Sequence, residues 1–283
     1  MSTSPRTHRV AGRWQAPPDV FPLRDNIPTD RFPVVTILLI ALNCIAYLFL
    51  QPKSGIDISG GSLNQADLVH YGFIPYEFTH WGSHCELVNS GQVACEGMRG
   101  VSGHASHQIA TWLTPFTAMF THAGLLHLGG NMLFLWIFGN NVEDSMGPVR
   151  FVVFYLVGGL AATALQLVVG ANSTTPNLGA SGAIAGVLGG YIVMYPRARV
   201  VTVVFIIFLF TILELPATFF LGFWFLQQLA FGALQSANTV ADGGVAYWAH
   251  VGGFAAGLLL IKLFATRRSS AAEQPRGLGG LRF

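Results

Sequence analysis

The sequence predicts an all-α membrane protein: a six-transmembrane-helix bundle with a long outer loop between spans one and two. The first observation is composition, since 52% of the 283 residues are hydrophobic and only 10% are charged. The second is the recurrence of long apolar runs, which is typical of membrane-spanning helices. The third is that thirteen of the 15 Lys and Arg residues fall on one side if both termini are cytoplasmic. This positive-inside bias favours an even number of spans.

The chain divides into a membrane domain between two polar tails. The N-terminal tail covers residues 1–31, the membrane domain 32–264, and the C-terminal tail 265–283. The first tail lacks the short apolar core of a signal peptide, so we expect it to be cytoplasmic. We expect both tails to be disordered segments at the surface of an integral, multi-pass membrane protein, whose immediate partner is the lipid bilayer.

Each expected span is an apolar run bounded by polar residues. The six runs are 32–50, 122–139, 151–170, 182–195, 215–234 and 245–264. The mostly apolar stretch 200–234 is too long for one span, and Glu214 and Pro216 divide it. We therefore expect residues 200–213 to be interfacial or re-entrant.

Residues 51–111 form the long outer loop, which exceeds the length that a connector needs and is expected to have structure of its own. Cys85 and Cys95 lie ten residues apart on the oxidising side, where either a disulfide or two free thiols fits the sequence. The loop also contains His70, His80, His84, His104 and His107. A zinc site is the alternative, but no ligand set has a familiar spacing, so we expect no metal. Residues 112–120, broken by Pro115, are expected to form an interfacial helix.

Ser181 stands at the start of a short helix rich in small residues. Gly182, Gly186 and Gly190 are four residues apart, so they form one stripe that lets a neighbouring helix approach closely. Fourteen residues from Gly182 to Tyr195 span roughly 21 Å, against a hydrocarbon core of about 30 Å. Ser181 is thus expected roughly 9 Å below the outer surface by the same arithmetic. Helix packing alone is the simpler explanation of the stripe.

His250 is expected at the same depth as Ser181. It lies 14 residues before the end of its span, as Ser181 does in its own. His250, Gly253 and Gly257 share a helix stripe that can press against the first glycine stripe and bring the histidine within hydrogen-bond reach of the serine. A serine beside a histidine base is an activated nucleophile. No carboxylate is expected near this depth, so we predict a Ser–His dyad with no third member.

His127 and Asn131 lie four residues apart on one face of the second span. Polar groups at membrane depth are costly and are candidates for function. Together with the Ser181 backbone N–H at a helix start, they could donate hydrogen bonds to a developing oxyanion. A structural hydrogen bond or helix-packing contact is the simpler explanation for each residue alone.

Three motifs carry a resemblance to a known family: HLGGN at 127–131, GASG at 179–182 and AHVGG at 249–253. In this order and on these spans, they resemble the rhomboid family of intramembrane serine proteases, of the bacterial six-span type. The resemblance runs from about residue 21 to residue 264. It implies a bacterial inner (cell) membrane protein with cytoplasmic termini, and no cofactor. Transmembrane proteins would be the substrates, and we expect no nucleic-acid partner.

The resemblance also implies roles for individual residues. Ser181 would be the nucleophile and His250 the general base in hydrolysis of peptide bonds in or near transmembrane segments. His127, Asn131 and the Ser181 N–H would form the oxyanion hole, with Gly179 and Gly182 flanking the serine. His122 would have a supporting or water-handling role at the outer mouth. The loop before span two would be membrane-embedded, and span five would be a mobile gate.

This chain departs from the pattern of some members at two places. Ala185 stands where some carry an aromatic residue that stacks on the catalytic histidine, so His250 is expected to be held differently. Leu113 follows Trp112 where some have an arginine, which leaves the anchoring of the outer loop open.

Two alternatives come from other functional classes. One is a non-hydrolytic member of the wider superfamily that binds or chaperones membrane helices, although such proteins lack the serine or the histidine. The other is a transporter in which His127, Asn131 and His250 relay protons. It would require a paired acidic residue in the membrane and inverted repeats, which the sequence does not contain.

Overall fold

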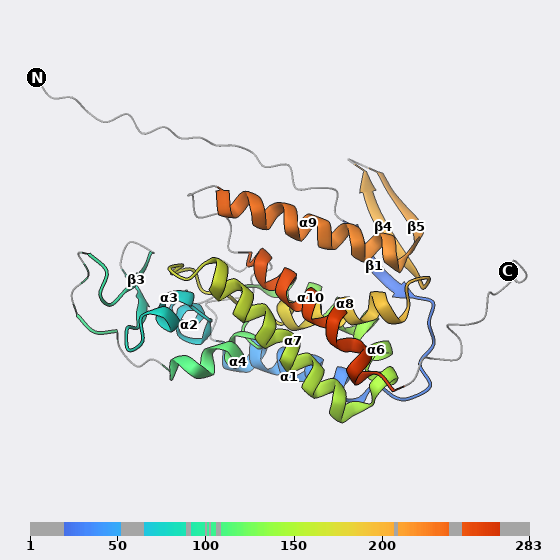
Figure 1. Ribbon diagram of the computed structural model, residues 1–283, viewed down its shortest axis with the longest axis horizontal. Helices are drawn as coiled ribbons and strands as arrows, with labels where there is room; N and C mark the ends of the chain where they lie inside the picture. The colour runs from blue at the N-terminus through green and yellow to red at the C-terminus, as the bar shows by residue number, and fades with distance from the viewer. Residues whose placement is uncertain are drawn as a thin grey trace, which may run out of the picture.

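The computed structural model describes residues 20–51, 65–88, 92–99, 101, 103–105, 109–206, 209–237 and 245–266. These residues are mostly helical, with two small sheets (Figure 1). Most of the two expected tails and His107 lie outside the described residues.

Helices occur within or next to each of the six expected apolar runs, and further short helices lie between them. In chain order they are α1 (Val34–Ile45), η1 (Ala46–Leu50), α2 (Gln65–Tyr71), α3 (Pro75–Thr79), η2 (Thr111–Leu113), α4 (Thr114–Ala118), α5 (Leu125–Phe134), η3 (Leu135–Gly139), α6 (Asn140–Met146), α7 (Pro148–Val169), α8 (Ser181–Met194), α9 (Ala217–Ala237) and α10 (Tyr247–Phe264). Within the described ranges, α7, α9 and α10 are long and apolar enough to cross a membrane. The combined helix Val34–Leu50 and α8 are apolar but shorter.

The expectation of an all-α fold needs correction, because residues 200–206 and 209–213 lie in strands. β4 (Arg199–Ile206) and β5 (Leu209–Pro216) pair as an antiparallel hairpin, and β1 (Val20–Asp25) pairs with the other edge of β4. The physical reason is the β-branched sequence VVTVV at 200–204, which favours extended backbone. β1 also gives regular structure to residues that the sequence assigned to a tail.

The outer loop contains α2, α3 and a hairpin of β2 (Cys85–Leu87) and β3 (Val93–Cys95). Cys85 and Cys95 face each other across this hairpin and are joined by a disulfide. Glu77 of α3 lies under the hairpin and accepts a hydrogen bond from the Cys85 N–H (2.8 Å). The loop is therefore a small cross-linked unit of its own, packed on a buried carboxylate.

Glycines let α8 press against α10 on one side and α7 on the other. A methyl group added at Gly253 would overlap the Gly182 carbonyl oxygen, and one at Gly257 would overlap that of Gly186. On the opposite side, a methyl group at Gly186 would lie 3.2 Å from the Gly158 Cα of α7. The two predicted stripes thus meet at these pairs, while Gly190 faces Ile261 and Phe154 side chains.

A cluster of buried polar side chains joins helices and strands at the end of the molecule that is remote from Ser181. Glu143 of α6 is 3% exposed and accepts hydrogen bonds from the backbone N–H groups of Val35 (2.9 Å) and Thr36 (2.8 Å), which caps α1. Asp25 of β1 accepts hydrogen bonds from Asn141 Nδ2 (2.7 Å) and the Tyr191 hydroxyl. Burial raises the pKa of Asp25 from 3.8 to about 6.

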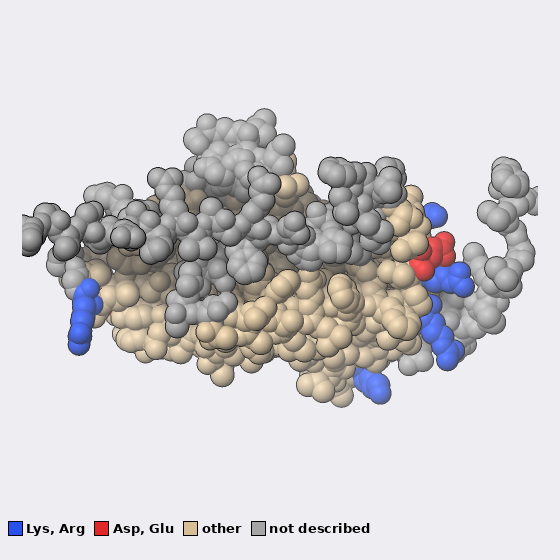
Figure 2. Space-filling model, turned by 90° about the horizontal axis from the view of Figure 1, so that it is seen from above, with Lys and Arg blue, Asp and Glu red and all other residues tan. Residues whose placement is uncertain are grey.

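Charged side chains gather at the two ends of the long axis. Figure 2 shows Lys and Arg at both ends of the face in view, mostly at the end that carries the β1–β4–β5 sheet in Figure 1. The uncovered surface between the ends is free of charged side chains on this face. Such a distribution suits a protein whose middle lies in hydrocarbon.

Candidate active site

A glycine turn places Ser181 as the first residue of α8. Gly179 has φ +102°, a conformation that favours glycine, and a methyl group there would lie 2.8 Å from the His127 ring. The Gly179 N–H donates to the Ala118 carbonyl (2.8 Å), which ties the turn to α4. The serine therefore sits at a helix N-terminus, where free N–H groups and the positive end of the helix dipole are located.

The structure brings Ser181 and His250 together. Ser181 Oγ and His250 Nε2 are 2.8 Å apart, although the residues are 69 positions apart in sequence. The contact lies one turn above the place where Gly253 of α10 meets the Gly182 carbonyl. The close approach of α8 and α10 is thus what sets the distance between the two side chains.

A second polar contact to His250 comes from α9, and the sequence did not predict it. His250 Nδ1 lies 2.8 Å from Gln228 Oε1. The Trp224 ring, one turn earlier on α9, has its centroid 5.7 Å from that of His250. Two signals could have pointed here: an amide within an apolar span, and Ala185 in place of an aromatic residue, which leaves His250 to be held by another helix.

His127 and Asn131 point toward the turn before Ser181. His127 Nδ1 accepts a hydrogen bond from the Ala123 N–H (3.3 Å), so the neutral ring carries its hydrogen on Nε2, which faces Gly179. Asn131 is 7% exposed, and its Nδ2 has no hydrogen-bond partner among the described residues. A methyl group at Gly179 would lie 3.4 Å from that nitrogen. Two N–H donors thus converge beside the serine.

His122 is fully buried and supports the glycine turn. Its Nε2 accepts a hydrogen bond from the Ala180 N–H (3.5 Å), and its ring meets that of His127 edge-on at 5.1 Å. Gln51, directly after η1, pairs its side-chain amide with both the N–H and the carbonyl of His122, each at 3.0 Å. The end of the first helix therefore holds the histidine in place.

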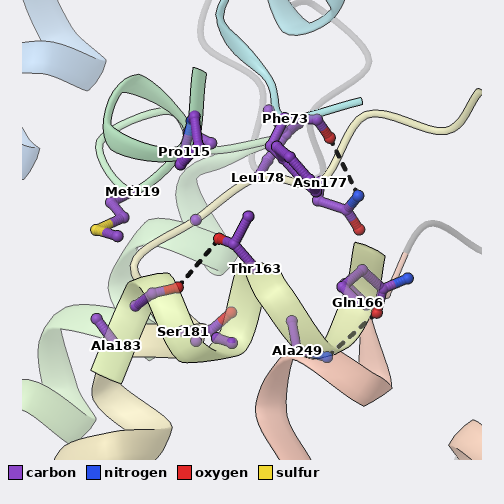
Figure 3. A pocket seen from close by; sticks show the side chains of 16 residues that line it. Phe73, Pro115, Met119, Thr163, Gln166, Asn177, Leu178, Ser181, Ala183 and Ala249 are labelled. Carbon is purple, nitrogen blue, oxygen red and sulfur yellow. Dashed lines mark hydrogen bonds between the residues drawn. The ribbon is translucent and has the colours of Figure 1, made fainter. Parts of the chain in front are cut away.

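A small cavity of about 40 Å³ opens beside Ser181. Figure 3 shows its lining, which comes from Phe73 between α2 and α3, from α4, α7, α8 and the start of α10, and from the segment before the serine. Gln166 of α7 crosses to α10, where it accepts a hydrogen bond from the Ala249 N–H (3.1 Å). A cavity of this size holds about three water molecules. No group of three or more His, Cys, Asp and Glu side chains suited to a metal occurs among the residues described.

Comparison with known proteins matches this chain to one family. The Rhomboid domain model matches residues 110–267, more than half of the chain. "Rhomboid protein 1, mitochondrial" of Saccharomyces cerevisiae is 33% identical over 151 residues, which is 50% of this chain and 38% of that protein. "Rhomboid protease GluP" of Bacillus subtilis is 31% identical over 157 residues, 56% of this chain and 24% of the relative.

A shorter match is with the human "Presenilin-associated rhomboid-like protein, mitochondrial", 33% identical over 94 residues, which is 32% of this chain and 25% of the relative. The matches with these three relatives span between about a quarter and two fifths of their lengths. The model match covers the glycine turn, Ser181, His250 and both N–H donors. The chain belongs to the rhomboid family of integral membrane proteins.

Proposed function

We propose that this protein is an intramembrane serine endopeptidase that cleaves peptide bonds in or near transmembrane segments of other membrane proteins. Ser181 is the nucleophile and His250 is the general base. The observation that carries the proposal is the 2.8 Å contact between Ser181 Oγ and His250 Nε2 at the mouth of a glycine-packed helix. Family membership and the name of the GluP relative support the same chemistry.

The reaction follows the usual course of acyl transfer. As Ser181 Oγ attacks the scissile carbonyl carbon, its proton passes to His250 Nε2. The tetrahedral intermediate collapses when His250 returns that proton to the leaving nitrogen, and an acyl-enzyme remains. His250 then takes a proton from water as the water attacks the ester carbonyl. When this second tetrahedral intermediate collapses, His250 returns the proton to Ser181 Oγ, which releases the second product and the free serine.

The oxyanion would lie above Gly179, because the available donors converge there. His127 Nε2–H and Asn131 Nδ2–H face that position, and the Ser181 N–H is at the helix start. Such donors stabilise charge that develops only in the transition state. Asn131 Nδ2 has no described partner in the resting site, so this hydrogen bond is gained as the reaction proceeds.

We place the protein in the membrane with six spans and both termini cytoplasmic. The helices that support this topology are α1 with η1, α5 with η3, α7, α8, α9 and α10. The 14 residues of α8 cover only roughly 21 Å, so Ser181 would lie below the outer surface, where a transmembrane substrate is within reach. A bacterial inner (cell) membrane fits this arrangement. The tails at 1–31 and 265–283 would then flank the domain on the cytoplasmic side.

Labelling with a fluorophosphonate tests the proposal directly. Detergent-purified wild type should be labelled on Ser181 and should cleave a transmembrane substrate, while Ser181→Ala should do neither. His250→Ala should also lose both activities, and the double variant should be no worse than either single variant because the pair acts as a unit. Cleavage that persists in Ser181→Ala, free of contaminating proteases, would refute the mechanism. A wild type that binds membrane helices without labelling would favour the non-hydrolytic alternative.

A further inference from the structure

Gln228 is a buried amide in an otherwise apolar part of α9. It is 6% exposed, and the 21 residues of α9 include no charged side chain. Burying an amide without hydrogen bonds costs free energy, so its two polar atoms need partners. Nε2 lies 3.4 Å from the Trp224 carbonyl oxygen, and Oε1 lies 2.8 Å from His250 Nδ1. The nitrogen and the oxygen of the Gln228 amide thus each have a polar partner.

These partners fix which way the amide points. A carbonyl oxygen only accepts hydrogen bonds, so the NH₂ group of Gln228 must face the Trp224 carbonyl. Oε1 then faces His250, and because Oε1 also only accepts, Nδ1 must carry the hydrogen. Nε2 of the neutral ring is left with its lone pair toward Ser181 Oγ. The opposite tautomer would present an N–H to the serine and could not take its proton.

We propose that Gln228 is a positioning residue that holds His250 in the tautomer and orientation needed to accept the Ser181 proton. This inference rests on the proposed function and would add a third, positioning member to the dyad that the sequence predicts. A neutral amide occupies the place that a carboxylate fills in Ser–His–Asp triads, where the third group likewise orients the imidazole. The amide suits a site in which a buried carboxylate would be costly.

Aromatic contacts keep Gln228 at this position. The Phe225 ring stacks on Phe254 of α10 at 4.5 Å, and the Trp224 ring lies near both Phe254 (6.1 Å) and His250 (5.7 Å). Ala185 of α8 offers no ring to His250, so α9 supplies the only aromatic side chain recorded against it in the described part of the chain. The base is therefore oriented by a helix that carries neither reacting group. The orientation of His250 therefore depends on the packing of α9 against α10.

The charges around His250 make the proposal testable by pH. Among the described residues, His127 on α5 interacts electrostatically with His250, while α10 itself carries Tyr247 one turn before His250 and Lys262 near its other end. α9 contains no titratable residue, and those of α7 and α8 (Arg150, Tyr155 and Tyr191) lie in the halves of these helices remote from Gln166 and Ser181. A carboxylate introduced at 228 would consequently be the nearest negative charge to the imidazole among the described residues. It would stabilise the imidazolium and move the acid limb of the kcat profile to higher pH.

The experiment compares full-length, detergent-purified Gln228→Leu and Gln228→Glu with the control Gln227→Leu. Gln227 is the preceding residue on α9 and has no recorded contact with His250 in the described residues. Steady-state cleavage of a transmembrane substrate gives kcat and KM as a function of pH, and the rate of fluorophosphonate labelling reports the nucleophile. Thermal melting compares the fold of the variants.

Gln228→Leu should lower kcat by about 10- to 100-fold with little change in KM, the range found when groups that orient metal-binding histidines are removed. Gln228→Glu should recover most of that loss, with its acid limb at higher pH, and the control should stay within about twofold of wild type. Equal rates for Gln228→Leu and the control, in a wild type that labels and cleaves, would overturn this inference alone. A Glu variant no faster than the Leu variant, with an unchanged pH profile, would also overturn it. An unlabelled, inactive wild type would instead refute the proposed function.

Discussion

Gly257 tests whether the close approach of α8 and α10 controls the reactivity of Ser181. It lies seven residues after His250, about 10 Å along the helix, so it touches none of the reacting groups. In Gly257→Ala the new methyl carbon would overlap the Gly186 carbonyl oxygen and lie 3.0 Å from the Gly186 Cα. Since non-bonded atoms prefer separations of about 3.5–4 Å, relief requires the helices to move apart by on the order of 1 Å.

That displacement is large on the scale of the site. It would lengthen the 2.8 Å contact between Ser181 Oγ and His250 Nε2 beyond the range of a hydrogen bond. A misplacement of about 1 Å in a catalytic site can cost roughly 100-fold in rate. Overpacking should also lower the free energy of unfolding by about 1–3 kcal/mol. We therefore expect Gly257→Ala to fold, to melt earlier, and to lose roughly 100-fold in kcat.

Gly222→Ala is the matched control, because a methyl group at Gly222 of α9 meets no atom within 4 Å. It makes the same chemical change in a membrane helix and should retain wild-type kcat. The assay is cleavage of a transmembrane substrate by folded protein, with the rate of fluorophosphonate labelling as a second readout. A folded Gly257→Ala protein with the kcat of Gly222→Ala would refute the idea that glycine contact sets the geometry.

Three further predictions concern other parts of the molecule. Asn131→Ala should lower kcat by roughly 10- to 1,000-fold with little change in KM, as expected for a donor that acts only in the transition state; a variant that mainly raises KM would contradict this. Reduction of the Cys85–Cys95 disulfide should destabilise the outer-loop hairpin by about 2–3 kcal/mol, seen as faster proteolysis within residues 65–105, and unchanged proteolysis would argue against it. Because the folded-state pKa of Asp25 is raised to about 6, its contribution to stability is fully present below pH 3.8 and is lost as pH rises through 6. Between pH 4 and pH 8, the free energy of unfolding of wild type should fall by on the order of 1–3 kcal/mol more than that of Asp25→Asn. Thermal melting of both proteins across this range measures the difference, and parallel pH profiles would contradict the reasoning.

Depth and small-residue spacing were enough to predict the central contact of the site. Ser181 and His250 each lie a fixed number of residues from the end of an apolar run, and the regular rise of a helix converts that count into a height. Glycines at four-residue steps then indicate which faces can touch. Both inferences use only local geometry, which a single sequence contains.

Gln228 could not be predicted in the same way. Its role depends on how α9 is rotated and which of its faces meets α10, and the hydrophobic pattern of a lipid-exposed helix specifies this poorly. Likewise, β1 pairs with a strand about 180 residues later, so no local pattern marks it. The hairpin at 199–216 did carry a signal in its β-branched residues, but an expectation based on hydrophobicity alone treats any apolar stretch as helical.

The three-stranded sheet connects the start of α9 to β1, which lies near the N-terminus. β5 ends at Pro216 and α9 begins at Ala217, whose N–H donates to the carbonyl of Ala198, the residue before β4 (2.7 Å). β4 in turn is hydrogen-bonded to β1, whose last residue, Asp25, is fastened to α8. A displacement of β1 would therefore be transmitted through backbone hydrogen bonds to the start of α9, about 16 Å along the helix from Gln228. β1 is thus connected through the sheet to the helix that orients His250, although the two lie about 200 residues apart in sequence.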